Sequence, residues 1–121
     1  MPAPALLSGI TVDCVDPTVL AGFWSALLDR QVTVPLPGWL RLDGRAGADP
    51  VINFQPVPEP KHGKARIHLD LVVEDIDEGT AAVLRLGGRS TGERHEYAEG
   101  VVLVMADPEG NEFCITQYYA G

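Results

Sequence analysis

The strongest constraint on what this chain can fold into is a pattern that it contains twice. Residues 9–15 (GITVDCV) alternate between polar and β-branched side chains, as a half-buried strand does, and Asp16-Pro17 then caps a helix with proline at its first position. About sixty residues later, residues 65–73 (ARIHLDLVV) alternate again, and Asp75 begins a second capping sequence, DIDE. The repeat indicates two copies of one supersecondary unit.

The first copy predicts a strand, a helix and three further strands. Apolar side chains recur after Asp16 at the spacing of a helix that buries one face: Val19, Leu20, Phe23, Trp24, Leu27 and Leu28. Short strands are predicted near residues 32–34, 39–42 and 51–57, because Gly and Pro separate these β-rich runs.

The second copy predicts the same order. Ala82, Val83 and Leu86 supply an apolar helix face, and Gly87-Gly88 ends that helix. Strands are predicted near residues 89–94, 101–105 and 112–116. The turn sequence DPEG precedes the last of these strands, which alternates so that Phe113 and Ile115 share one face and Glu112, Cys114 and Thr116 share the other.

The domain organisation follows from the size of the repeat. The units span about residues 6–57 and 65–119, and a Pro-rich polar joint (QPVPEPKHGK) lies between them. A unit this small cannot close a hydrophobic core alone, so we predict one domain over residues 1–121 in which the halves share a core. The predicted fold class is α+β, built from two βαβββ repeats.

Composition limits the partners. The net charge of −8 and the pI near 4.6 argue against nucleic acid and anionic membranes, which bind clustered Lys and Arg. The start, MPAPALLSGITV, has no basic segment and too short an apolar run for a signal peptide or membrane span, so a cytoplasmic protein is expected. Cys14 and Cys114 are then expected to be free thiols.

The doubled pattern, with DPEGNEF before the last strand and HLDLVVEDID in the second half, resembles the vicinal oxygen chelate superfamily. That superfamily includes glyoxalase I, bleomycin-resistance proteins and extradiol dioxygenases, and the chain looks most like its glyoxalase-like bacterial domains. The resemblance implies a curled mixed sheet whose concave face holds a ligand. It does not identify the activity, because this fold carries several chemistries.

The resemblance also implies four metal-ligand positions, and here this sequence departs from the family. They fall on Gly9, Asn53, His68 and Cys114, of which only His68 is a standard ligand at its position. Glycine has no donor, an amide is a weak donor, and a thiol replaces the carboxylate of the family. We therefore predict no metal and no other cofactor, although Asp70 or Glu112 could complete a makeshift site.

Strand parity extends the predicted ligand face beyond those four positions. Side chains two residues apart share a face, so this face is expected to be strongly polar. Its predicted ligand-binding members are Thr11, Asp13, Asn53, Gln55, Arg66, Glu112, Cys114 and Thr116, with His68 and Asp70 as a catalytic pair. A structural interior would instead carry Val, Ile and Leu, so the face predicts a pocket for a small polar molecule.

Three functions remain open on these residues. One is a small-molecule enzyme, such as a lyase, isomerase or hydrolase, in which His68 and Asp70 act as general acid and base. The second is a non-catalytic protein that sequesters a drug-like molecule, as the bleomycin-resistance type does. The third is an interaction module that kept the fold. The resemblance further implies a homodimer. Each of the two candidate residues also has a purely structural explanation: His68 as a hydrogen-bonded structural residue and Cys114 as an inert buried thiol.

Overall fold

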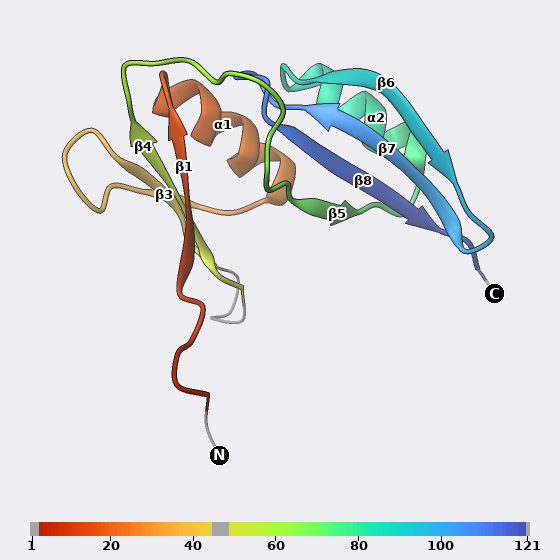
Figure 1. Cartoon of the computed structure of the whole chain (residues 1–121), viewed down its shortest axis with the longest axis horizontal. Helices are drawn as coiled ribbons and strands as arrows, with labels where there is room; N and C mark the ends of the chain where they lie inside the picture. The colour runs from red at the N-terminus through yellow and green to blue at the C-terminus, as the bar shows by residue number, and fades with distance from the viewer. Residues whose placement is uncertain (1–2, 45–48, 121) are drawn as a thin grey trace. The chain divides into compact units, whose positions relative to one another are not determined.

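The computed structural model of the chain describes residues 3–44 and 49–120. It divides into two compact units, Met1–Pro60 and Lys61–Gly121. Each unit has one helix and one four-stranded mixed sheet in the order strand, helix, strand, strand, strand (Figure 1). The predicted α+β class with two βαβββ repeats is confirmed. The single shared core stays a prediction.

The first unit begins with β1 (Gly9–Cys14) and α1 (Pro17–Leu28). The strands β2 (Val32–Thr33), β3 (Leu40–Leu42) and β4 (Val51–Pro56) follow. The order in the sheet is β1-β4-β3-β2, with β1 parallel to β4 and the other pairs antiparallel. The first and last strands of the unit therefore lie side by side.

The start of α1 is fixed by local hydrogen bonding, as the sequence predicts. Asp16 is the N-cap, and its Oδ1 accepts from the backbone N–H of Val19 at 3.2 Å. The helix buries one face through Leu20, Ala21, Phe23 and Trp24. Val19 was expected on that face, and this is wrong, because its side chain is 52% exposed. It lies in the capped first turn, away from the buried stripe.

The second unit contains β5 (Asp70–Val72), α2 (Ile76–Arg85), β6 (Arg89–Glu96), β7 (Gly100–Ala106) and β8 (Glu112–Tyr118). Its sheet has the order β5-β8-β7-β6. The first and last strands, β5 and β8, again pair in parallel, and the other two pairings are antiparallel. The two units thus repeat one topology.

The helix α2 lies along one face of this second sheet (Figure 1). Asp75 caps it, with Oδ2 accepting from Glu78 N–H at 2.9 Å, and Gly87 ends it with a φ of 108°. Gly79 allows a close approach between α2 and the chain before it, because a Cβ there would lie 2.9 Å from Val73 Cγ1. The buried side chain of Val83 completes the helix face.

The β7–β8 hairpin is held by one buried carboxylate. Asp107 is 1% exposed, and its Oδ1 accepts from the backbone N–H groups of Glu109 and Asn111, both at 3.0 Å. The side-chain amide of Asn111 also donates to Asp107 Oδ2 at 3.0 Å, and Gly110 adopts a φ of 84°. This turn sets where β8 begins, and so which side chains β8 presents on each face.

The strand predicted over residues 65–73 is wrong in its first half. The strand begins only at Asp70, and Ile67, which was expected to pack against a helix, is 82% exposed. Alternation alone could not show that this segment lacks a neighbouring strand before Leu69.

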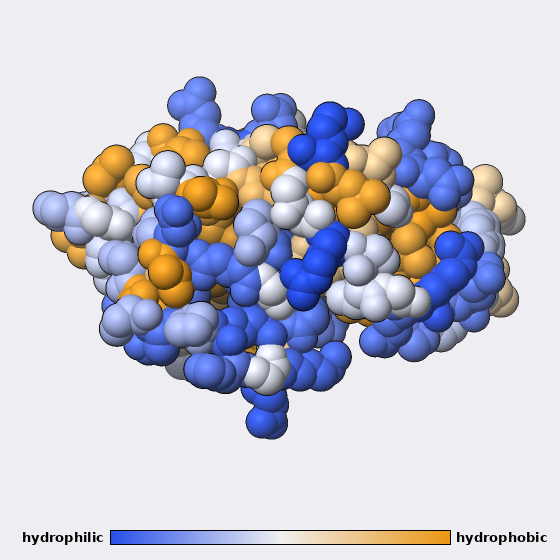
Figure 2. Space-filling view, turned by 90° about the horizontal axis from the view of Figure 1, so that it is seen from above, coloured by the Kyte–Doolittle hydropathy of each residue, from blue (hydrophilic) through white to orange (hydrophobic). Residues whose placement is uncertain are grey.

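The surface is mostly hydrophilic in the view of Figure 2, with hydrophobic side chains between the charged ones. In the part of the chain that the structure describes, no helix is long and apolar enough to cross a membrane.

We expect Asp107→Ala to lower the free energy of unfolding by about 2–4 kcal/mol, because it removes a buried acceptor of several hydrogen bonds. The matched change Asp75→Ala removes one exposed cap and should cost about 1 kcal/mol. Chemical denaturation of both variants measures this difference. Equal losses would contradict the assigned role of the Asp107 turn.

Candidate functional site

The face of the second sheet opposite α2, called here the open face, carries the candidate site. Buried side chains such as Phe113 and Ile115 occupy the helix side of β8. Their neighbours Glu112, Cys114 and Thr116 therefore lie on the open face, as the alternation predicts. In β7, register places Val104 beside Cys114 on that same face.

The open face contains a pocket of about 300 Å³. Most of its lining is polar or ionisable, although Val102 and Val104 form part of its floor. The lining residues are Lys64, Ala65, His68, Asp70, Glu93, His95, Tyr97, Val102, Val104, Glu112 and Cys114. A polar pocket at this position supports the predicted ligand face.

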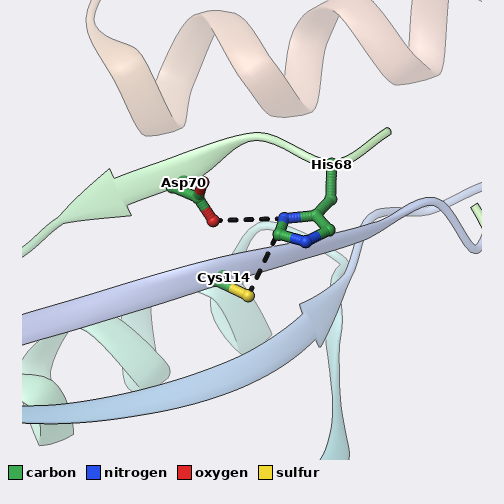
Figure 3. Close-up of side chains that lie close together, drawn as sticks. All are labelled: His68, Asp70 and Cys114. Atoms are coloured by element: carbon green, nitrogen blue, oxygen red, sulfur yellow. Dashed lines mark hydrogen bonds and ion pairs between the residues drawn. The ribbon is translucent and has the colours of Figure 1, made fainter. Parts of the chain in front are cut away.

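His68, Asp70 and Cys114 converge at one wall of this pocket (Figure 3). His68 Nδ1 lies 3.1 Å from Asp70 Oδ1 and 4.0 Å from Cys114 Sγ. The contact arises because β5 pairs with β8 in a register that sets Asp70 beside Cys114. Both His68 and Asp70 keep much of their side chains exposed, so a ligand can reach them.

The Cys114 thiol is not activated by this arrangement. Burial raises its pKa above the ordinary value, and the negative charge of Asp70 raises it further. Lys64 opposes this shift, but it is the weakest of the contributing groups. Because the thiolate is the nucleophile, these surroundings favour the inert alternative for Cys114.

Glu112, the first residue of β8, is held as an anion on the open face. Its carboxylate accepts from Lys61 Nζ at 2.8 Å and from Ala65 N–H at 3.0 Å. The hydrogen bond from Lys61 is the main cause that lowers the pKa of Glu112 to about 2. A carboxylate so strongly held as an anion does not carry protons near neutral pH.

The structure adds a second histidine–carboxylate pair, which the sequence reasoning missed. His95 lies in β6, where its side chain is exposed and lines the pocket. Its Nε2 lies 2.6 Å from Glu93 Oε2, and this hydrogen bond lowers the pKa of Glu93. The polar period-two run of Arg89, Thr91, Glu93 and His95 was the available signal.

Two predicted ligand residues of the second unit do not line the pocket. Thr116 lies on the open face beside Val72 and Val102, but its own side chain is not among those that line the pocket. Arg66 is exposed in the segment that precedes β5. Their ligand-binding roles stay predictions.

The four predicted residues of the first unit do share one face. Parallel pairing sets Thr11 beside Asn53 and Asp13 beside Gln55. The side chain of Asn53 is already engaged, because its Oδ1 accepts from Arg41 Nε at 2.8 Å. The sequence reasoning missed Arg41, which reaches Asn53 only through the pairing of β3 with β4. Binding of a ligand by these residues stays a prediction.

The metal site that the family implies does not fit the residues present. A Cβ at Gly9 would lie 2.8 Å from Val51 Cγ2, so no ligand side chain is accommodated there without a shift. The guanidinium of Arg41 donates to the Asn53 oxygen and places a positive charge beside it, which disfavours a cation at that donor. The second unit does hold a group of potential ligands, His68, Asp70 and Cys114, with donor atoms within 4.8 Å of one another.

Comparison with known proteins now decides the family. The sequence model of the glyoxalase-like domain matches residues 9–116, which is nearly the whole chain. The chain belongs to the glyoxalase-like domain family. Among curated protein sequences, none matches it significantly.

Solved structures show the same fold at low sequence identity. A glyoxalase/bleomycin resistance protein/dioxygenase family enzyme from Burkholderia phytofirmans is 18% identical with a TM-score of 0.75, covering 95% of this chain and 100% of its own. A fosfomycin resistance protein from Mesorhizobium loti is 14% identical with a TM-score of 0.72, covering 98% and 95%. A lactoylglutathione lyase from Agrobacterium tumefaciens is 16% identical with a TM-score of 0.64, covering 96% and 95%. Because proteins of such different names share one fold, the fold does not identify the specific function of this chain, which has to be inferred from its own residues.

We expect Cys114 to react slowly with iodoacetamide at pH 8, because its raised pKa keeps little thiolate present. Asp70→Asn removes a negative charge that raises this pKa and should speed the alkylation several-fold. Peptide mass spectrometry separates Cys114 from the buried Cys14, which serves as an internal control. Alkylation of Cys114 as fast as that of a free activated thiol would contradict the assignment.

Proposed function

We propose that the protein binds a small polar organic molecule in the pocket of the open face and acts on it by acid–base chemistry, as a glyoxalase-like lyase or isomerase that does not use the family's metal site. The observation that carries the proposal is His68, held at 3.1 Å by Asp70 on the wall of a pocket of about 300 Å³. Pockets of this size suit small metabolites.

Asp70 gives His68 the geometry of a general base. When Nδ1–H donates to the carboxylate, the lone pair of the imidazole is on Nε2. The carboxylate also stabilises the imidazolium that forms when Nε2 takes a proton from the ligand. Val102 and Val104 give the pocket an apolar floor, against which the carbon skeleton of a ligand can pack.

The alternative is a protein that sequesters its ligand without converting it, as in the bleomycin-resistance type. Two observations favour it: the Cys114 thiol is not activated, and the family's metal positions do not offer a complete ligand set. Recovery of a bound molecule unchanged after long incubation would select this alternative.

We further propose that the protein is a cytoplasmic homodimer. Exposed apolar side chains on β5 and β8 support an interface, since Val72 is 70% and Tyr118 63% exposed. Hydrophobic side chains are also visible among the polar ones on the surface in Figure 2. Analytical ultracentrifugation at micromolar concentration tests the dimer, and a monomer there would reject it.

A ligand of the pocket can be found by a thermal-shift screen of metabolites and drugs. The binding proposal predicts that His68→Gln lowers the affinity for this ligand about tenfold, which is about 1.4 kcal/mol. Asp70→Asn should weaken it as well, because His68 loses the carboxylate that holds it. The control is His62→Gln, the same change at an exposed histidine that does not line the pocket.

Catalysis adds a stronger expectation. Conversion of that ligand, followed by NMR, should fall by roughly 10²-fold or more in His68→Gln, which exceeds the loss of binding. A variant that binds and converts the ligand as well as the unmodified protein would contradict the role of His68.

The metal proposal predicts that the protein purifies with well under one metal ion per chain. Added chelator should then leave the ligand-induced rise in melting temperature unchanged, because the donors at Gly9 and Asn53 are missing or engaged. Elemental analysis measures the ion content. One bound ion per chain that is lost in His68→Ala together with function would show that the His68–Asp70–Cys114 group is a metal site.

A further inference from the structure

The three carboxylates that line the His68 pocket, Asp70, Glu93 and Glu112, each have a partner on or beside the open face. Lys61 and the Ala65 N–H hold Glu112, at 2.8 and 3.0 Å. His95 holds Glu93 at 2.6 Å, and Asp70 pairs with His68. In an acidic protein, the negative charge of this face is thus already engaged.

Two cations in the same region have no such partner. Lys64 and Arg89 line a hollow of about 330 Å³ together with Thr91, Glu93 and Glu112. Neither cation forms an ion pair within residues 3–44 and 49–120. The charge of Lys64 nevertheless helps to lower the pKa of Glu93 and opposes the rise in the pKa of Cys114, so its ammonium group is close to the pocket. These two charges are free to meet a ligand.

This hollow continues into the His68 pocket. The two share Lys64, Glu93, Val104 and Glu112 as lining residues. Strand register places Arg89 opposite Ala106 and His95 opposite Val102, so β6 runs from the cationic end to the histidine end of one groove. One small molecule can therefore contact both ends.

We propose that the ligand of the His68 pocket carries a carboxylate or phosphate group, which Lys64 and Arg89 bind at the end of the groove. The inference rests on the proposed function and specifies the substrate class. A guanidinium presents a planar fork that matches either anion, and an ammonium adds a compact charge beside it. Glu109 lines the adjoining hollow together with Arg89.

The test uses the full chain and two probes, inorganic phosphate and succinate, titrated separately at constant ionic strength with sodium chloride. Backbone amide shifts in NMR spectra should saturate at Lys64, Arg89 and Thr91. Saturation by phosphate alone assigns a phosphate ligand, and saturation by succinate alone assigns a carboxylate. Arg89→Gln and Lys64→Gln should each raise the dissociation constant by roughly three- to tenfold.

Arg94→Gln is the matched control, because it removes the same charge from the same strand. Arg94 pairs with Glu96 and lies opposite Leu103, and it does not line the groove. Its dissociation constants should equal those of the unmodified protein. No saturable shift up to about 50 mM of either probe, or an equal loss of affinity in Arg94→Gln, overturns the proposal.

Failure of the anion-subsite proposal can be distinguished from failure of the proposed function. An uncharged ligand whose binding depends on His68 and not on Arg89 would overturn the anionic class and leave the pocket's function standing. Anion binding without any ligand that depends on His68 would support the cationic subsite and reject the acid–base role.

Discussion

The parallel pairing of β5 with β8 is the contact on which the candidate site depends. β5 has only three residues, yet Leu69 O accepts from Cys114 N–H at 3.0 Å and Thr116 O accepts from Val73 N–H at 2.8 Å. These bonds fix the register that brings Asp70 beside Cys114 and His68 against both. Parallel strands need a long crossover, and α2 with the β6–β7 hairpin supplies it. The side chains of β8 that pack on the helix side, such as Phe113 and Ile115, hold in place the strand whose other face carries the site.

Charge on the open face is arranged in pairs, and this decides which groups are available for chemistry. Lys61 keeps Glu112 ionised, so that carboxylate is not a proton carrier. Burial and Asp70 keep the Cys114 thiol protonated. What remains is His68, oriented by Asp70, together with the cations at the far end of the groove. The base and the anion subsite proposed above would suit a small acidic metabolite better than a large apolar drug.

Membership of the glyoxalase-like family settles the fold and leaves the chemistry to individual residues. The structural relatives are under 20% identical to this chain and carry different names. At two of the positions where the family resemblance implies metal ligands, this chain has a glycine whose added Cβ would press on Val51 and an asparagine held by Arg41. A fold that accommodates several activities changes function through a few side chains of this kind.

The sequence by itself determined the elements that depend on near neighbours. Asp16 and Asp75 cap helices through N–H groups three residues away. The turn DPEGN likewise folds around the carboxylate of Asp107, so in each case the interacting residues are only a few positions apart in the sequence. Period-two alternation likewise placed Cys114 and Glu112 on one face of β8. The repeated unit, and hence the α+β class, follows from these local rules.

Only the tertiary structure decided which distant residues meet. His95 lines the pocket because β6 pairs with β7, and Lys61 contacts Glu112, which is far from it in the sequence. Residues 65–68 do not form a strand, because no neighbouring strand pairs with them. Alternation gives the face of a side chain and says nothing of its partner strand, its register or the charge opposite it. Those depend on contacts between segments far apart in the sequence, where hydrogen bonding and burial outweigh local preference.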